Sequence, residues 1–116
     1  MSEPQRDDAA IAARLRARRA ELKDAGAAHE EDRRPVKLDQ TRVGRLSRMD
    51  ALQGQAMAQE LERRREVEVA RIDAALERLA AGEYGWCLTC GEAIEPRRLE
   101  FDPATPLCLA CAGRAG

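Results

Sequence analysis

Two closely spaced cysteine pairs constrain this chain more than any other feature. The pairs are Cys87 with Cys90 and Cys108 with Cys111, in the spacing C-x2-C-x17-C-x2-C. Two residues between cysteines let one tight turn aim both sulfurs at a single ion, and a second pair completes a tetrahedron. The gap between the pairs lies in the range of roughly 15–20 residues that is typical of zinc ribbons. We therefore predict one structural Zn²⁺ ion held by these four thiolates.

Two alternatives remain for the cysteines. A redox dithiol is disfavoured because no βαβ pattern surrounds either pair, whereas iron on four thiolates stays open. A zinc ion whose four positions are all filled by protein has no place for water or substrate, so it stabilises structure. The single histidine, His29, lies far from the cysteines in sequence. Since no nucleophile and base can be paired on spacing, we expect that the protein is not an enzyme.

The composition favours long paired helices. The chain of 116 residues has one Trp, one Tyr and one Phe, too few large side chains for a thick core. Alanine, leucine, arginine and glutamate, all strong helix formers, are abundant. With 20 basic and 21 acidic residues and a net charge of -1, no basic excess is present to hold nucleic acid. Residues 1–10 are polar and contain no apolar signal segment, so we expect a reducing, cytoplasmic setting without membrane contact.

Apolar spacing predicts two helices. The first covers residues 8–34 and ends before Pro35; its stripe, spaced by three and four residues, comprises Ile11, Leu15, Arg18, Leu22 and Ala25. The second covers about residues 48–81, where Ser47 and Asp50 match a capping box and Gly82 a C-terminal cap. Its expected apolar face comprises Met49, Leu52, Leu61, Val69, Ile72, Leu76 and Leu79. Glu68 and Arg71 are expected to pair along its wet side.

These elements predict an all-α dominated fold. Residues 1–81 form an antiparallel two-helix coiled-coil hairpin whose tip is residues 35–47, and residues 82–116 form a small four-cysteine zinc-finger module. A hairpin this thin buries only one narrow seam, so the metal site supplies part of the stability. A seam that closes within one chain predicts a monomer.

The C-terminal segment resembles a known family. The residues Gly82-Glu-Tyr-Gly-Trp-Cys-Leu-Thr-Cys-Gly, together with Ile94, Arg98-Leu99, Pro103 and Leu107-Cys-Leu-Ala-Cys, are similar to the DksA/TraR zinc-finger family. The resemblance covers about residues 82–111, and a helical hairpin precedes the finger in the same way.

The resemblance implies a transcriptional regulator that does not bind DNA. Family members insert a coiled coil into the secondary channel of bacterial RNA polymerase, and acidic residues at its tip act near the polymerase active site. The best-studied members work together with guanosine tetraphosphate.

The predicted tip departs from the family pattern. The best-known members carry D-x-x-D-x-A, whereas Asp39 and Asp50 are eleven residues apart in this chain. We take both as candidate partner-binding residues. Their structural alternatives are a turn or N-cap role for Asp39 and a capping-box role for Asp50.

Two other functions compete with regulation of the polymerase. A nucleic-acid-binding zinc ribbon would use Arg97, Arg98 and the basic tip to contact phosphates. A structural coiled-coil adaptor would instead use the apolar seam to join two chains.

Overall fold

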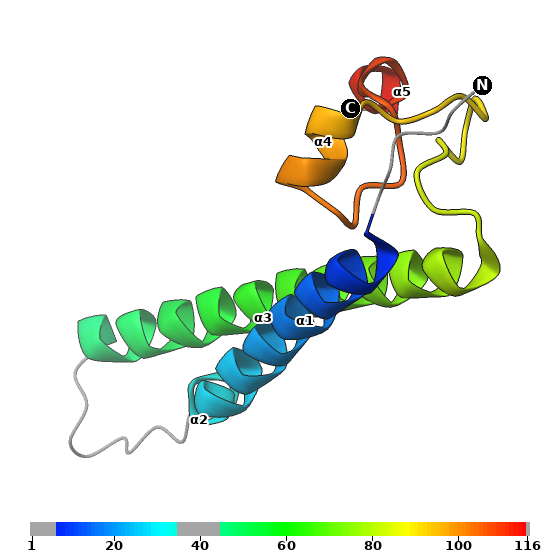
Figure 1. Cartoon of the computed structure of the whole chain (residues 1–116). Helices are drawn as coiled ribbons and strands as arrows, with labels where there is room; N and C mark the ends of the chain where they lie inside the picture. The colour runs from blue at the N-terminus through cyan, green and yellow to red at the C-terminus, as the bar shows by residue number, and fades with distance from the viewer. Residues whose placement is uncertain (1–6, 35–44, 116) are drawn as a thin grey trace.

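The computed structural model of the chain describes residues 7–34 and 45–115. Two helical arms form an antiparallel hairpin, and a compact C-terminal segment covers one end of it (Figure 1). The described part measures 72 × 30 × 20 Å. None of its helices is long and apolar enough to cross a membrane.

The first arm consists of two helices. Helix α1, Asp8–Ala28, begins at Asp7, whose side chain accepts a hydrogen bond from the Ala10 amide. It ends before His29, and a single further turn, α2, spans Glu30–Arg33. The expected uninterrupted helix over residues 8–34 is therefore wrong at one point. Gly26, a weak helix former, lies in the last turn before the break.

The second arm is one helix, α3, which spans Arg45–Ala81. Its 37 residues correspond to about 55 Å. It begins three residues earlier than predicted, so Ser47 and Asp50 lie within the helix and the capping-box interpretation is wrong. At its other end Gly82 has φ of 74° and its N–H bonds back to the last turn, which confirms the predicted C-terminal cap.

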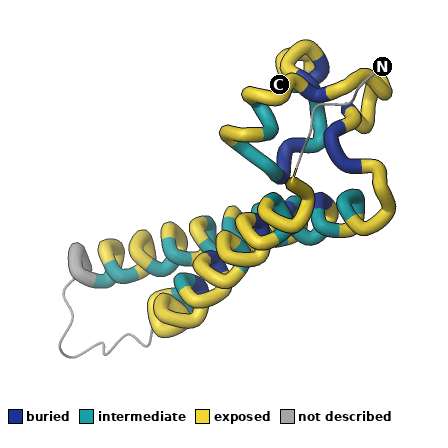
Figure 2. Tube along the Cα trace, viewed as in Figure 1, coloured by how far each residue is buried: buried dark blue, intermediate teal, exposed yellow. Residues whose placement is uncertain are grey.

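The buried seam lies where α1 packs against the C-terminal half of α3 (Figure 2). Leu15 and Leu22 of α1 are 1% and 7% exposed, and Ile72 and Ala75 of α3 are 1% and 0% exposed. Partly buried neighbours complete this cluster: Ile11, Val69, Leu76, Leu79 and Leu99.

The N-terminal half of α3 departs from the predicted apolar face. Met49, Leu52 and Leu61 are 53%, 47% and 49% exposed, so they lie outside the seam. The core instead extends beyond the hairpin at the other end, where Tyr84 and Ala104 of the C-terminal segment join it. The apolar spacing therefore predicted the buried face of α3 correctly only in the C-terminal half of the helix, where the C-terminal segment packs in addition to α1.

Ion pairs join the arms from outside the seam. Arg18, predicted to lie on the apolar stripe, is exposed, and its Nε donates to Glu68 Oε1 at 3.1 Å. The next residue, Arg19, donates from Nε to Asp73 Oδ1 at 2.7 Å. The predicted pair between Glu68 and Arg71 is therefore wrong, because Glu68 bonds across the seam to α1.

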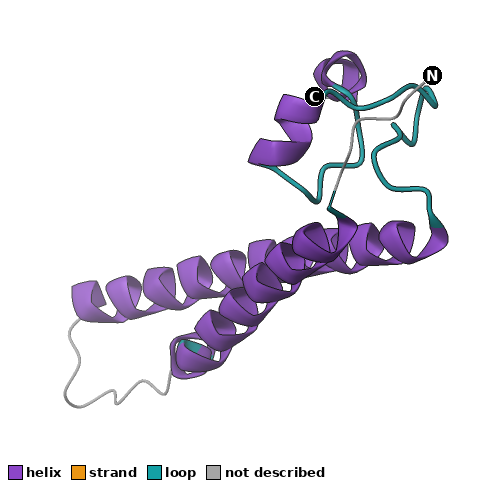
Figure 3. Ribbon diagram, viewed as in Figure 1, coloured by secondary structure: helices purple, strands orange, loops and turns teal. Residues whose placement is uncertain are grey.

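The C-terminal segment folds around two short helices. Helix α4 spans Pro96–Phe101 and α5 spans Leu109–Ala115. The loop before α4 closes on itself through an isolated antiparallel bridge between Trp86 and Ala93. Within the described residues the remainder is loop, without strands (Figure 3).

Candidate metal centre

The structure brings the four predicted cysteines together. The sulfur atoms of Cys87, Cys90, Cys108 and Cys111 all lie within 4.8 Å of one another, and Cys90 Sγ is 3.8 Å from Cys108 Sγ. A zinc–thiolate tetrahedron with bonds of about 2.3 Å separates its sulfurs by about 3.8 Å, whereas a disulfide requires about 2.05 Å. The cluster therefore fits a four-coordinate metal ion and contains no disulfide.

The first cysteine pair is shaped by a glycine turn. Gly91 has φ of 75°, and its N–H donates to the Cys87 carbonyl at 2.9 Å. The Cys87 N–H in turn donates to the Glu92 carbonyl at 2.8 Å. A side chain at Gly91 would be strained in this conformation. This closed turn directs both sulfurs of the pair to the same side.

The second pair is carried by the start of α5. Cys108 precedes the helix, its carbonyl accepts from the Ala112 N–H at 2.9 Å, and Cys111 lies in the first turns. Glu95 Oε1 accepts from the Leu109 N–H at 3.1 Å and so caps the helix start. Helical spacing thus brings the second pair of sulfurs to one side as well.

The electrostatics of the cluster call for a cation. Backbone N–H groups of Cys108 and Cys90 lower the pKa of the Cys87 thiol to about 6. Bonding to the Cys108 thiol, together with burial, raises the pKa of Cys111 to about 12. Four like charges this close do not form together unless a cation neutralises them. The donor set, four soft sulfurs, suits Zn²⁺.

Apolar packing closes the site on its protein side. Cys87, Cys108 and Cys111 are buried and Cys90 is exposed. Ile94, 3% exposed, packs among the buried cysteines, with Leu99 and Leu107 partly buried beside it. With four protein sulfurs at the centre, no further ligand position is provided for substrate.

Two polar contacts hold the metal segment against the hairpin, and a third joins two loops within the segment. Tyr84, 2% exposed, donates from its hydroxyl to the Pro103 carbonyl at 2.8 Å. Arg71 of α3 bonds Asp102 at 2.9 Å, and Arg14 of α1 donates to the Glu100 carbonyl at 2.6 Å. Sequence reasoning missed these contacts because they join residues distant in the chain. Only the lone tyrosine so close to the cysteines was a usable signal.

Other candidate residues lie apart from the cysteines. Asp50 is exposed near the start of α3, about 45 Å along the helix from its end. Asp39 lies outside the described residues. The exposed His29 bonds Asp32 at the joint of the first arm. Arg97 is exposed, whereas Arg98 donates from Nε to the Leu107 carbonyl at 2.8 Å and supports the second cysteine pair.

A four-cysteine finger at the base of a helical hairpin defines the class of protein, and comparison with known sequences agrees. Residues 82–115 match the prokaryotic dksA/traR C4-type zinc finger family. The RNA polymerase-binding transcription factor DksA of Haemophilus influenzae is 44% identical over 41 residues, which are 35% of this chain and 28% of that protein. An uncharacterized protein of Aquifex aeolicus is 47% identical over 49 residues, 40% of this chain and 34% of that one.

The likeness in structure is broader than the likeness in sequence. Transcription factor DksA2 from Pseudomonas aeruginosa has a TM-score of 0.73 and 28% identity, over 93% of this chain and 81% of that chain. The chain spans about a third or less of the length of the curated relatives it matches, but the structural match includes the hairpin. Residues 82–115 therefore resemble the DksA/TraR zinc finger in sequence, and the chain as a whole resembles DksA2 in structure.

Proposed function

We propose that this protein is a transcriptional regulator that binds bacterial RNA polymerase through its secondary channel, without binding DNA. The observation that carries the proposal is the structural match to a transcription factor over 93% of the chain, hairpin and finger together. The finger adds independent support because it matches the same family by sequence.

The shape of the molecule suits entry into a narrow channel. Helix α3 extends over about 55 Å, and the metal segment packs only on the end where α1 begins and α3 ends (Figure 1). The described residues at the opposite end belong to the two arms alone and include exposed residues such as Asp50. We therefore assign the leading position to this distal end, with the finger outside.

The metal has a structural part in this proposal. Cys87, Cys90, Cys108 and Cys111 hold one Zn²⁺, whose binding free energy stabilises the fold of the finger. The finger in turn adds Tyr84 and Ala104 to the hairpin core. Zinc therefore supports the hairpin indirectly.

Asp39 and Asp50 are the proposed residues that act on the polymerase. Guanosine tetraphosphate is the proposed co-effector, and the setting is the bacterial cytoplasm. Arg98 is committed to the Leu107 carbonyl, which disfavours the alternative of a nucleic-acid-binding ribbon built on Arg97 and Arg98.

The proposal is tested with purified bacterial RNA polymerase and the zinc-loaded chain. We expect a direct complex and a changed initiation rate in a reconstituted reaction, with and without guanosine tetraphosphate. Asp50→Asn should still bind but alter initiation less than the wild type. Glu77→Gln, which removes the charge of an exposed acidic residue elsewhere on α3 without changing its size, is the matched control.

Binding to the DNA alone, weakened steeply by salt, would favour the nucleic-acid alternative instead. Wild-type protein that neither binds the polymerase nor changes initiation would refute the proposed function.

A further inference from the structure

Side chains of α3 hold the end of the first arm. Gln55 Nε2 donates to the Arg34 carbonyl at 2.6 Å, and Gln59 Nε2 approaches the Arg33 carbonyl at 3.4 Å. Carbonyl groups in the last turn of a helix have no partner within that helix. The two glutamines, four residues apart on α3, supply donors for them. The first arm is thereby held at the point where the described residues before the tip end.

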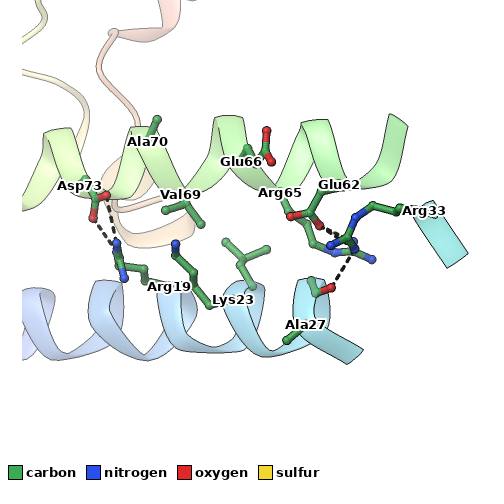
Figure 4. A pocket seen from close by; sticks show the side chains of 12 residues that line it. Arg19, Lys23, Ala27, Arg33, Glu62, Arg65, Glu66, Val69, Ala70 and Asp73 are labelled. Carbon is green, nitrogen blue, oxygen red and sulfur yellow. Dashed lines mark hydrogen bonds and ion pairs between the residues drawn. The ribbon is translucent and has the colours of Figure 1, made fainter. Parts of the chain in front are cut away.

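One turn further along α3, Glu62 binds two arginines from different helices (Figure 4). Its Oε2 atom is 3.3 Å from Arg33 NH1 of α2 and 3.0 Å from Arg65 NH1 of α3. All three side chains are shielded, with exposed fractions of 21% for Arg33, 21% for Glu62 and 19% for Arg65. Removal of the Glu62 charge would leave two shielded cations side by side.

A glycine on α1 makes room for this carboxylate. Gly26 is buried, and a Cβ atom there would lie 3.0 Å from Glu62 Oε2 and 3.1 Å from Oε1. Arg33 NH1 also donates to the Gly26 carbonyl at 2.8 Å. Glu62 and Arg33 therefore join the end of α1, the turn α2 and the long helix α3 at one point.

The neighbouring ion pairs of α3 differ from this one. Glu60 pairs with Arg63 and Arg64, but those arginines are 66% and 72% exposed and belong to the same helix. Such pairs stabilise a helix slightly and fix no other element. The Glu62 contacts instead cross from α3 to the first arm. The three side chains involved, Arg33, Glu62 and Arg65, line a cavity of about 380 Å³.

From this geometry we infer that Glu62 is a positioning residue, which fixes α2 and the end of the first arm at Arg34 against α3 and so sets how the two arms lie relative to each other toward the distal end of the hairpin. The consequence for transcription rests on the proposed function. The positioning itself is independent of it, because it follows from contacts between α2, α3 and Gly26.

Two measurements on the zinc-loaded full chain test the inference. The first is nuclear magnetic resonance of Glu62→Gln, which keeps size and removes charge. We expect loss of the nuclear Overhauser contacts between the Gln55 side-chain amide and residue 34, with shifted amide signals for residues 30–34. Glu66→Gln, an exposed carboxylate one turn away, should leave both unchanged.

The second measurement is the effect on initiation at saturating protein, where every polymerase is occupied. Glu62→Gln should bind yet produce a smaller maximal effect than the wild type. Val69→Ala, which removes two methyl groups from a partly buried core position, is the control for lost stability. It should keep the full maximal effect at saturation.

Unchanged contacts at residues 30–34 in Glu62→Gln would overturn the inference. A full maximal effect despite lost contacts would overturn its consequence for transcription, as would an equal loss in Val69→Ala. If the wild type itself leaves initiation unchanged, the proposed function fails, and the magnetic resonance measurement alone then decides whether Glu62 positions the arm.

Discussion

Alanine substitutions at two helical glycines give a quantitative test of the packing between the arms. Gly54 lies inside α3, and a Cβ atom there would meet nothing within 4 Å. Gly54→Ala should therefore gain about 1 kcal/mol in the free energy of unfolding, the usual difference between the two residues in an exposed helix.

Gly26→Ala faces an opposing cost. Its Cβ atom would lie 3.0 Å from Glu62 Oε2, so the carboxylate must retreat and weaken its contacts with Arg33 and Arg65. Contacts of this shielded kind contribute about 1 kcal/mol each. We therefore expect Gly26→Ala to be neutral or to destabilise by up to about 1 kcal/mol, and its melting temperature to lie about 5 °C or more below that of Gly54→Ala.

Thermal and urea unfolding followed by circular dichroism would measure the difference, with zinc in excess throughout. The decisive control repeats both substitutions in a Glu62→Ala background. With the carboxylate gone, Gly26→Ala should become stabilising, as Gly54→Ala is. This cycle also removes any smaller propensity gain at Gly26 that arises from its place in the last turn of α1. A Gly26→Ala variant as stable as Gly54→Ala in the wild-type background would refute the placement of Glu62 against α1.

Three further outcomes are expected. Elemental analysis should find one zinc per chain in wild type, and Cys108→Ser should lose this zinc and loosen the segment after Gly82. The reason is that the zinc binding free energy, roughly 10 kcal/mol or more, is also folding free energy. Folded, reduced wild type without metal would contradict this prediction. Ile72→Asp, which buries an unpaired carboxylate, should lower the melting temperature far more than Ala74→Asp on the exposed face; equal melting temperatures would contradict the seam. Light scattering should give the mass of a monomer, and a dimer would indicate that the exposed apolar residues of α3 pair between chains.

The metal site was predictable because its geometry is local. Two residues between cysteines and a glycine after the second fix a turn with few conformations. The structure accordingly places the four sulfurs together and gives Gly91 a positive φ. The identity of the bound ion, and the ligand role of the cysteines, remain predictions that the zinc analysis above would check.

The contacts between segments were not predictable because local rules compete with them. Glu68 and Arg71 satisfy the helical spacing for an ion pair. In the folded chain each finds a partner elsewhere, Glu68 at Arg18 and Arg71 at Asp102. A spacing rule considers only neighbours within one helix. The positions of α1 and of the finger decide which oppositely charged side chain lies closest to Glu68 or to Arg71.

The ends of the two arms show the same limit and bear on how the distal end works. The first arm ends at Arg33, two residues before Pro35, as proline predicts. The start of α3 was misplaced because Ser47 and Asp50 match a capping pattern that the helix does not use. Since Gln55 bonds the Arg34 carbonyl, α3 continues for ten residues, about 15 Å, beyond the point where it holds the first arm. Asp50 belongs to this extension, together with the exposed Met49 and Leu52. The Asp50 carboxylate therefore lies on a part of α3 that extends beyond the contact between Gln55 and Arg34. Because Glu62 fixes the first arm against this helix, the place of the Asp50 charge relative to the first arm depends on the Glu62 contacts.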